Sequence, residues 1–434
     1  MTTDVTLDAG EVDVSTFNPF DPATMQCPFP HYAAMREQAP VNFVEALGMY
    51  FVTRHDLVLQ ILRDPKTYSS AFGVSGMAPQ QMDERLVEVI RDGYPRVSTM
   101  LTADMPEHTR YRRLVSKAFT PKVIAELEPE IRAIAVQLAD SIAGPGAGNG
   151  PIEFVERFGI PLPVAVIARA LNVPDDRLVD FKRWSDDAIA GIGTNISIEE
   201  RIEAERGVND YQRYFAAEFE RRVDDPQDDL LTALVNARID DDDDEVEDKR
   251  PLDMAEMLSI VQQLLVAGNE TTTKMLTEMM RLLGERPDEW AKLRDDPSRI
   301  PAVVEETLRL ATPTQGMFRI STRDHELDGV AIPKGASIVI VFASANRDAE
   351  LFPGSDDFDP ERERLRDHLA FGKGIHFCLG ANLSRLEGQV ALEELSKRID
   401  SFTLADSNDF AYHPSFLLRG LQRLDLELEL VSDR

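Results

Sequence analysis

The chain has only two cysteines, Cys27 and Cys378, among its 434 residues. A disulfide framework is therefore implausible for a chain of this length. Two cysteines also cannot build a zinc or iron–sulfur site that needs four thiolate ligands. A cysteine that does chemistry here must work alone or through a cofactor.

Basic residues and long apolar runs are also scarce. The chain has 47 Lys and Arg against 77 Asp and Glu, a formal net charge of -30. Such a surface repels phosphate backbones and anionic membranes, so we expect neither nucleic-acid nor membrane binding. No run of about 18 or more apolar residues appears, and the N-terminus lacks the basic start and apolar stretch of a signal peptide. We therefore expect a cytoplasmic protein.

The chain shows no internal repeat, and its strand signals are few. We expect a flexible N-terminus over residues 1–15 and a single domain over residues 16–434. Short apolar, β-branched segments predict strands at residues 49–52 and 338–342. Leucines alternate with acidic residues over 424–430, a period of two that predicts a half-exposed strand. The strand signals thus cluster near the two ends of the chain.

Most of the middle of the chain has helical periodicity. Asp253 and Glu256 are spaced like a capping box, and the pattern they open continues to Gly284. About thirty residues at about 1.5 Å each make a rod of about 45 Å, long enough to cross a domain. The acidic run at 240–245 before it is predicted to be a solvated loop. The predicted fold class is mainly α, with a small β-rich region.

One cysteine lies in a segment rich in glycine. Residues 371–380 read F-G-K-G-I-H-F-C-L-G, and glycines there let a backbone approach a flat ligand closely. Apolar residues recur at helical spacing after Cys378, which places it at a helix N-terminus. The helix dipole there is expected to lower the pKa of the thiol. The residues alone equally allow a buried structural cysteine in a turn.

This segment resembles the haem-binding signature of the cytochrome P450 family, F-x-x-G-x-x-x-C-x-G. It matches at Phe371, Gly374, Cys378 and Gly380. The resemblance implies the P450 fold, with a large helical domain and a small β-rich region, and haem b as the cofactor. It also implies that the Cys378 thiolate binds the iron, where it favours cleavage of the O–O bond.

Glu306 to Arg309, within E-E-T-L-R, resembles the family's E-x-x-R motif about seventy residues before the cysteine. The two side chains share a helical face and can pair. The resemblance implies that they form a buried network with Arg362. Alone, the motif has little weight, because surface helices carry many such pairs.

Midway along the long predicted helix, A-G-N-E-T resembles the family's oxygen-activation motif, A-G-x-(D/E)-T. The resemblance implies that Gly268 leaves room for oxygen beside the haem. It also implies that Glu270 and Thr271 deliver protons to it as an acid–alcohol pair. The residues alone also allow a helix kink with a back-bonded threonine.

P-E-H-T-R-Y-R at residues 106–112 resembles the family segment P-x-H-x-x-x-R. The resemblance implies that His108 and Arg112 bind the haem propionates, together with Arg319 and His376. Anions in a buried pocket need such partners, although each residue alone also fits a surface charge. The other haem contacts implied are Phe371, Gly372, Gly380, Ala267 and Gly268.

The family reading implies a monooxygenase that inserts one atom of O2 into a hydrophobic small molecule, such as a terpenoid, steroid, fatty acid or aromatic. Electrons would come from NAD(P)H through a ferredoxin reductase and a ferredoxin, and the enzyme is expected to be a monomer. A peroxide-driven peroxygenase and a non-catalytic haem sensor or ligand carrier stay open as alternatives. Glu270 and Thr271 argue against both, because neither needs the acid–alcohol pair.

Three further sets of residues are predicted from family position or composition. Trp184 to Asn195, with Gly191 and Gly193, is predicted to form a mobile lid. Each pocket candidate equally fits plain core packing, and the basic residues also allow the alternative of scattered solvated charges. The predicted ferredoxin-binding patch comprises Arg110, Arg113 and Lys117, at i, i+3 and i+7 of a helix, and Lys373. The predicted substrate pocket comprises Met100, Leu101, Leu264, Gln315, Met317, Phe318, Phe416 and Leu417.

Overall fold

The computed structural model describes residues 12–72, 83–144, 150–190, 196–240, 243 and 245–431. Its architecture is mainly helical with small sheets, which confirms the predicted fold class. The α-helices are α1 (Pro22–Gln26), α2 (Phe29–Gln38), α3 (His55–Arg63), α4 (Glu84–Arg91), α5 (Glu107–Ser116), α6 (Pro121–Glu126), α7 (Glu128–Ala143), α8 (Pro161–Ala170), α9 (Leu178–Ile189), α10 (Ile198–Asp224), α11 (Leu230–Val235), α12 (Met254–Gly284), α13 (Pro287–Asp295), α14 (Ile300–Ala311), α15 (Phe342–Ala345) and α16 (Ala381–Ser396). The strands are β1 (Val41–Val44), β2 (Met49–Val52), β3 (Tyr68–Ser69), β4 (Ile152–Glu153), β5 (Met317–Ser321), β6 (His325–Leu327), β7 (Val330–Ile332), β8 (Ser337–Ile340), β9 (Ile399–Leu404) and β10 (Asp425–Leu430).

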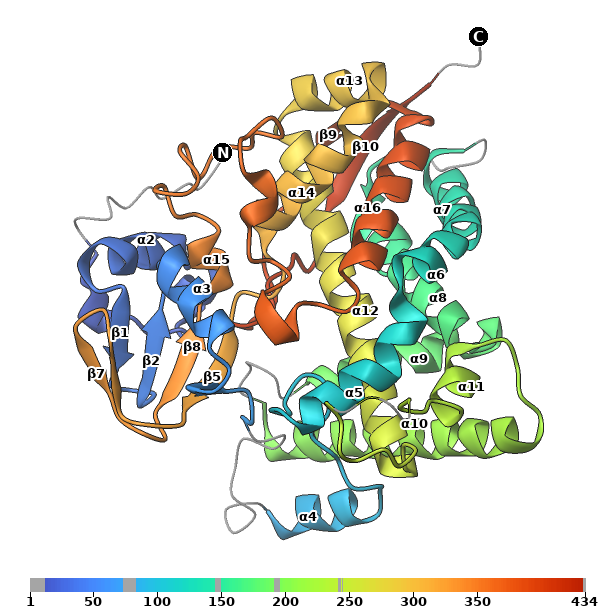
Figure 1. Cartoon of the computed structure of the whole chain (residues 1–434). Helices are drawn as coiled ribbons and strands as arrows, with labels where there is room; N and C mark the ends of the chain where they lie inside the picture. The colour runs from blue at the N-terminus through green and yellow to red at the C-terminus, as the bar shows by residue number, and fades with distance from the viewer. Residues whose placement is uncertain are drawn as a thin grey trace.

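Helix α12 runs through the middle of the molecule (Figure 1). It begins with the predicted capping box: the Asp253 carboxylate accepts from the Glu256 backbone N–H at 2.9 Å, and the Glu256 carboxylate accepts from the Asp253 N–H at 2.9 Å. These two bonds satisfy donors that every helix start leaves free. The helix ends at Gly284, as predicted. Most of its side chains are buried, and they lie on several sides of the helix, as expected for a helix at the centre of a large domain.

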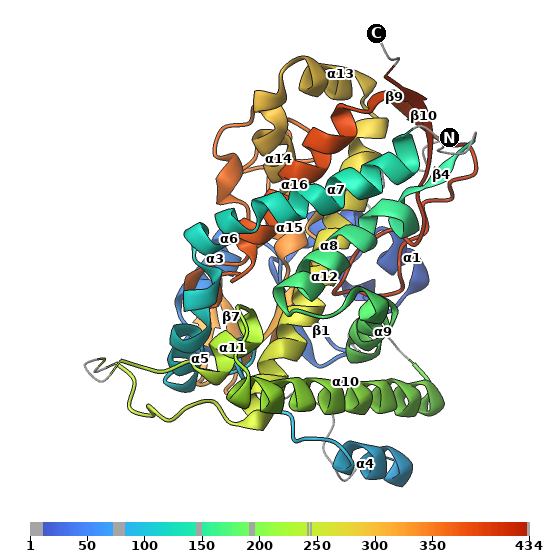
Figure 2. The same cartoon turned by 90° about the vertical axis from the view of Figure 1, so that its right-hand side faces the viewer.

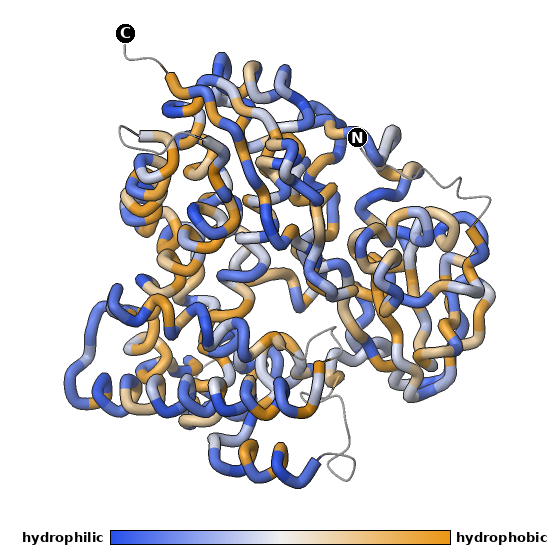
Figure 3. Tube along the Cα trace, turned by 180° about the vertical axis from the view of Figure 1, so that it is seen from behind, coloured by the Kyte–Doolittle hydropathy of each residue, from blue (hydrophilic) through white to orange (hydrophobic). Residues whose placement is uncertain are grey.

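The helical part of the core lies around α12. Helices α7, α8, α14 and α16 surround its C-terminal half, and α10 crosses its N-terminal half (Figure 2). One hydrophobic cluster joins α7, α12, α14 and α16, and another joins α8, α9, α10 and the first half of α12. Seen from behind, hydrophobic stretches alternate with hydrophilic ones along the outer helices (Figure 3). Helix α12 therefore contributes to both hydrophobic clusters and connects them.

The main sheet lies to one side of the helices (Figure 1) and has the strand order β1-β2-β8-β5-β3. Strand β2 covers residues 49–52 as predicted, and it pairs in parallel with β8. The strand predicted at 338–342 ends earlier, because Phe342 begins α15. Strand β10 confirms the period-of-two prediction near the C-terminus and pairs with β9 and β4.

Two expectations about the chain's path need correction or fall partly outside the described residues. Val12 is buried and residues 14–16 form a 3₁₀ turn, so the packed chain begins before the predicted boundary at residue 15. Trp184 is buried within α9 and does not lie in a lid; Gly191 and Gly193 are outside the described residues. Within the described part, no helix has the length and apolar character needed to cross a bilayer.

Candidate functional site

The cysteine loop, residues 371–380, folds back tightly on itself before α16. The Cys378 backbone N–H donates to the Phe371 carbonyl at 2.9 Å. Gly372 and Gly374 have φ of +63° and +73°, values that favour glycine. A Cβ at Gly374 would also collide with the Leu62 carbonyl oxygen of α3. These glycines let the loop pass close to α3 and bring Cys378 to the start of α16.

The thiol of Cys378 is under two opposing influences. Burial raises its pKa, whereas the Gly380 backbone N–H, Arg112 and Arg385 lower it. Burial is the largest of these effects, and the pKa is raised overall. The predicted direction was therefore wrong, because Cys378 precedes the first residue of α16 and loses more hydration than the helix end compensates. A cation at the sulfur, such as iron, would supply the missing stabilisation of the thiolate.

Two arginines and two histidines gather beside this loop. His108 and Arg112 come from α5, Arg319 from β5, and His376 from the 3₁₀ turn within the loop. The rings of His108 and His376 have centroids 4.2 Å apart, and Nδ1–H of His376 donates to the Met100 carbonyl at 3.1 Å. The Nε2 atoms of both histidines are buried without a hydrogen-bond partner. The four predicted propionate ligands therefore lie together, with two polar atoms still to be satisfied.

The pKa values in this group reflect burial and mutual repulsion. Burial and Arg112 lower the pKa of His108 to about 4. Burial, His108 and Arg319 lower the pKa of His376 to about 4, and burial lowers that of Arg319 to about 10. Asp104 opposes all three shifts but only weakly. With Asp104 as a weak counter-charge, the two charged arginines and the ring nitrogens of the two neutral histidines are suited to bind an anionic group such as a haem propionate.

Among the described residues of α12, a small residue is exposed only in the middle of the helix. Ala267 is exposed, and Gly268 and Thr271 are half-buried, although the residues around them are buried. A Cβ at Gly268 would lie 3.3 Å from the Ile167 side chain, so the helix packs closely on α8 here. The Thr271 hydroxyl donates to the Ala267 carbonyl at 2.8 Å. This back-bond is the conformation that the residues alone had also allowed.

The Glu270 carboxylate lies between two lysines. It pairs with Lys274, one turn later on α12, and with Lys182 of α9 at 3.3 Å. Burial raises the pKa of Glu270, but the two lysines outweigh it and the pKa is lowered. No hydrogen bond joins Glu270 to Thr271, so the predicted pair lies on one helix without direct contact. Reasoning from the sequence missed both lysines, although Lys274 lies at the i+4 position that pairs on a helix.

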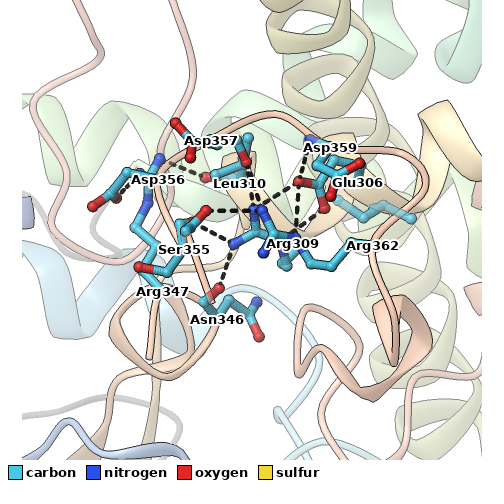
Figure 4. A network of polar contacts seen from close by, with 12 residues as sticks. Glu306, Arg309, Leu310, Asn346, Arg347, Ser355, Asp356, Asp357, Asp359 and Arg362 are labelled. Carbon is cyan, nitrogen blue, oxygen red and sulfur yellow. Dashed lines mark hydrogen bonds and ion pairs between the residues drawn. The ribbon is translucent and has the colours of Figure 1, made fainter. Parts of the chain in front are cut away.

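The three residues predicted to form a network are in contact (Figure 4). Glu306 and Arg309 of α14 pair through two bonds of 2.7 Å and are fully buried. Arg362 lies 3.5 Å from the same carboxylate, and the Asp359 backbone N–H donates to it at 2.9 Å. Arg309 also donates to the carbonyls of Asn346, Ser355 and Asp357. This network fastens the irregular segment before the cysteine loop onto α14.

A second buried cluster on α14 was missed by reasoning from the sequence. Glu305, next to Glu306, binds both His368 and Arg385, and the Arg385 guanidinium lies over the Phe371 ring. The doublet of glutamates in E-E-T-L-R was the available signal. Adjacent helical residues point about 100° apart, so the two carboxylates must serve different neighbours.

The predicted substrate-pocket residues have mixed placements. The Phe318 ring lies 6.3 Å from Phe416 and stacks on Phe72 at 4.2 Å, which makes a row of aromatic side chains. The amide N–H groups of Gln315 donate to the Ala311 and Thr312 carbonyls at the end of α14, so they are not available to a substrate. Leu101 is exposed and Met317 half-buried, whereas the remaining candidates, Met100, Leu264 and Leu417, are buried.

The predicted basic patch needs correction at Arg110. Its side chain is 3% exposed and binds Glu256 at the start of α12 at 2.9 Å, so it cannot form part of a docking surface. Arg110 and Arg113, three residues apart on α5, differ in exposure because the side of the helix that carries Arg110 packs on α12. Lys373 is half-buried in the cysteine loop itself.

The two exposed members of that patch are covered by acidic residues of the segment before α12. Arg113 pairs with Glu245 and lies 3.4 Å from Asp243. Lys117 lies 3.4 Å from Asp240. The predicted solvated loop therefore lies along α5, although its residues 241, 242 and 244 are outside the described residues. Arg113 and Lys117 can therefore bind a partner protein only if this acidic segment does not cover them.

Comparison with known proteins gives a consistent result. The family profile for cytochrome P450 matches residues 194–404. The chain is 36% identical to cytochrome P450 107B1 of Saccharopolyspora erythraea over 93% of this chain and 96% of that protein. It is also 36% identical to 6-deoxyerythronolide B hydroxylase of the same organism, over 92% of this chain and 95% of that protein. The structure of cytochrome P450 CYP109Q5 from Chondromyces apiculatus has a TM-score of 0.83 and 33% identity, covering 97% of this chain and 100% of that one.

Proposed function

Because this chain belongs to the cytochrome P450 family and is a monooxygenase of that family, we propose that it inserts one atom of O2 into a hydrophobic small molecule. The cofactor implied is haem, and we propose haem b. When bound, the haem supplies the activation of dioxygen and the transfer of one oxygen atom. The protein's residues supply ligation, anion binding, proton delivery and substrate placement.

The observation that carries this proposal is the Cys378 thiol beside a cluster of two arginines and two histidines. Cys378 would hold the iron as its thiolate, and Arg112 links the two parts, since it lowers the pKa of that thiol. His108, Arg319 and His376 would bind the propionates: the Nε2 atoms of both histidines are buried without a hydrogen-bond partner, and Arg319, with a pKa of about 10, is positively charged at neutral pH. Phe371, Gly372, Gly380, Ala267 and Gly268 would contact the macrocycle. A simple structural cysteine needs no such cluster of arginines and histidines.

Glu270 and Thr271 would deliver protons on the α12 side. The Thr271 hydroxyl donates to Ala267 at 2.8 Å, so it can carry a proton onward only after rotating away from that carbonyl. The Glu270 carboxylate is held ionised by Lys182 and Lys274 and would receive its proton from them or from water. Proton delivery therefore requires the Thr271 hydroxyl to rotate and the salt-bridge partners of Glu270 to change.

The substrate is proposed to be apolar over most of its surface. The aromatic row of Phe72, Phe318 and Phe416, with Met100 and Leu264, offers few hydrogen-bond groups. One relative of this chain is named as a hydroxylase of 6-deoxyerythronolide B. We therefore propose a bulky terpenoid-, steroid-, macrolide- or fatty-acid-like substrate, with an aromatic compound as a smaller member of the class.

Electrons are proposed to come from NAD(P)H through a ferredoxin reductase and a ferredoxin. The decisive experiment compares product formation from a panel of apolar compounds with NADH, ferredoxin and reductase against product formation with peroxide alone. A monooxygenase requires the complete electron system. Turnover only with peroxide would support a peroxygenase, and haem binding without turnover in either system would support a sensor or carrier.

The ligation itself is tested by spectroscopy. The ferrous–carbon monoxide complex should show the red-shifted Soret band that a thiolate ligand gives. Replacing Cys378→His should abolish this band, while Cys27→Ser is the matched control because Cys27 is an exposed free cysteine. Survival of the band in the Cys378 variant would refute the assignment.

A further inference from the structure

Glu305 joins three elements on the cysteine side of the molecule. It lies on α14 and is 3% exposed. One oxygen of its carboxylate, Oε2, lies 2.9 Å from Nε2 of His368 and 3.0 Å from a terminal nitrogen of Arg385, and Nε of Arg385 donates to the other oxygen. His368 precedes the cysteine loop, and Arg385 belongs to α16, which follows it. We call Glu305, His368 and Arg385 the Glu305 anchor.

The hydrogen bonds of His368 define its tautomer. Its Nδ1 accepts from the Ala370 backbone N–H at 3.2 Å, so the ring proton must reside on Nε2. Nε2–H then donates to Glu305. A neutral ring satisfies both bonds, and it fixes the backbone immediately before Phe371 relative to α14.

The Phe371 ring is contacted by both partners of Glu305. The Arg385 guanidinium lies 4.5 Å from the ring centroid, and the His368 ring lies 6.0 Å from it. The Phe371 carbonyl in turn accepts the hydrogen bond of the Cys378 N–H. A continuous chain of contacts thus runs from Glu305 through Phe371 to the backbone of Cys378.

Charge acts along the same route. The Arg385 guanidinium lies 4.5 Å from the centroid of the Phe371 ring, and Phe371 is hydrogen-bonded to Cys378, so the positive charge of Arg385 lies near the sulfur and stabilises a thiolate there. Glu305 is ionised at neutral pH, because His368 and Arg385 outweigh its burial and lower its pKa to about 2. Removing the charge of Arg385 or that of Glu305 must therefore change the electrostatic potential near Cys378 in opposite senses.

We propose that the Glu305 anchor is a set of positioning residues that holds the Phe371–Cys378 loop in place and sets the reduction potential of the iron bound by Cys378. The proposal rests on the proposed haem-thiolate function. Groups behind a metal ligand commonly orient it and tune the metal. In haem proteins, the charge and hydrogen bonding around the axial ligand are such controls.

The test measures the reduction potential of the substrate-free holoenzyme by spectroelectrochemistry. Arg385→Gln should lower the potential, because the reduced iron and its thiolate lose a stabilising cation. Glu305→Gln should raise it, because Arg385 is then no longer neutralised. Arg206→Gln and Glu203→Gln form the matched control, an exposed Arg–Glu pair on α10, and both should keep the wild-type potential.

A merely structural role would move both anchor variants in the same direction or not at all, and either result would overturn the proposal. Arg385→Lys guards against a failure of the Gln variants to retain haem. It keeps the cation but loses the planar stacking on Phe371, so its potential should stay near wild type while its thermal stability falls. If Arg385→Lys lowers the reduction potential as much as is expected for Arg385→Gln, the proposal is also overturned.

The ferrous–carbon monoxide spectrum separates this proposal from the proposed function. If the wild-type protein lacks the red-shifted band, thiolate ligation fails and the anchor proposal fails with it. If the band is present and the two Gln variants do not diverge in potential, only the anchor proposal is wrong.

Discussion

At the scale of single residues, the most consequential arrangement is that of Glu270 and Thr271. Each has a stable partner of its own, the lysines for Glu270 and the Ala267 carbonyl for Thr271. Neither is aligned with the other. Rotation of a half-buried hydroxyl takes place in nanoseconds or less, so the back-bond does not prevent Thr271 from acting.

We expect Thr271→Ala to uncouple oxygen use from product formation. The variant should consume NADH at a rate near that of wild type but release more peroxide and less product, because a proton is no longer delivered at the right atom. Product and peroxide formed per NADH measure this directly. Thr277→Ala is the matched control, since Thr277 makes the same back-bond to Thr273 further along α12. Full coupling in the Thr271 variant, or equal uncoupling in both, would contradict the relay.

At the scale of elements, α5 serves two sides of the molecule at once. His108 and Arg112 belong to the cluster of arginines and histidines beside the cysteine loop, while Arg113 and Lys117 face the acidic segment before α12. Both exposed pairs of this segment are worth little, about 0.2–1 kcal/mol each. The segment can therefore be displaced from α5 at small cost by a more highly charged partner.

We expect neutralisation of the acidic segment to strengthen binding of an acidic ferredoxin. Asp240→Asn, Asp243→Asn and Glu245→Gln together should lower the KM for ferredoxin at low ionic strength, because Arg113 and Lys117 become free. The control replaces the exposed Glu220, Asp224 and Asp228 by their amides, which removes equal charge from the C-terminal end of α10 and the residues just after it. An unchanged or raised KM in the first variant, or an equal decrease in both, would show that α5 does not dock the donor.

The start of α12 provides a prediction about pH. Glu256 binds Arg110, Arg250 and Tyr111, and these bonds with the Asp253 N–H outweigh its burial and lower its pKa to about 2. A lowered folded-state pKa contributes stability above the ordinary value of about 4.5, and this is lost as the pH falls through 4.5 toward 2. Relative to Glu256→Gln, wild type should gain about 3 kcal/mol at neutral pH.

The measurement is the difference in free energy of unfolding between wild type and Glu256→Gln, by urea titration across pH. The difference should shrink steadily below about pH 4.5. The exposed Glu220→Gln should differ from wild type by less than about 0.5 kcal/mol at neutral pH. A difference for Glu256→Gln that stays constant down to about pH 2.5 would mean that the carboxylate charge is not the cause.

Periodic elements and motifs could be predicted from the sequence, but which side chains are buried could not. The capping box at Asp253 and the strand at 425–430 follow from local spacing, so they could be predicted. Arg110 could not be placed correctly, because which side of α5 packs on α12 depends on tertiary contacts. The bonds of the Gln315 amide N–H groups to the carbonyls at the end of α14 depend on such contacts too. The sign of the pKa change at Cys378 was wrong for the same reason.

At the scale of the whole molecule, the charge of -30 is the dominant electrostatic fact. Interactions between exposed charges extend over about 30 Å at about 0.01 M salt but only about 8 Å at about 0.15 M. At low salt, much of the acidic surface therefore repels itself and any acidic partner. The small basic areas near the cysteine loop act only at short range.

We expect the melting temperature of the holoenzyme to rise when NaCl is increased from about 0.01 M to about 0.15 M. Screening relieves the self-repulsion of the acidic surface more than it weakens the individual ion pairs. Differential scanning calorimetry with the salt concentration as the only variable measures this. A melting temperature that falls over this range would mean that the ion pairs outweigh the net charge.

The neighbouring glutamates of α14 have a consequence for the order in which the molecule opens. Glu306 holds Asp359 and Arg362, and Glu305 holds the residues around Phe371. Both segments are therefore attached to the same helical turn, and neither can unfold locally without disturbing that turn. Amide hydrogens of the cysteine loop and of the segment containing Asp359 should then exchange with solvent as one cooperative unit, with a common opening free energy. Loss of haem and fraying of that segment would be a single event.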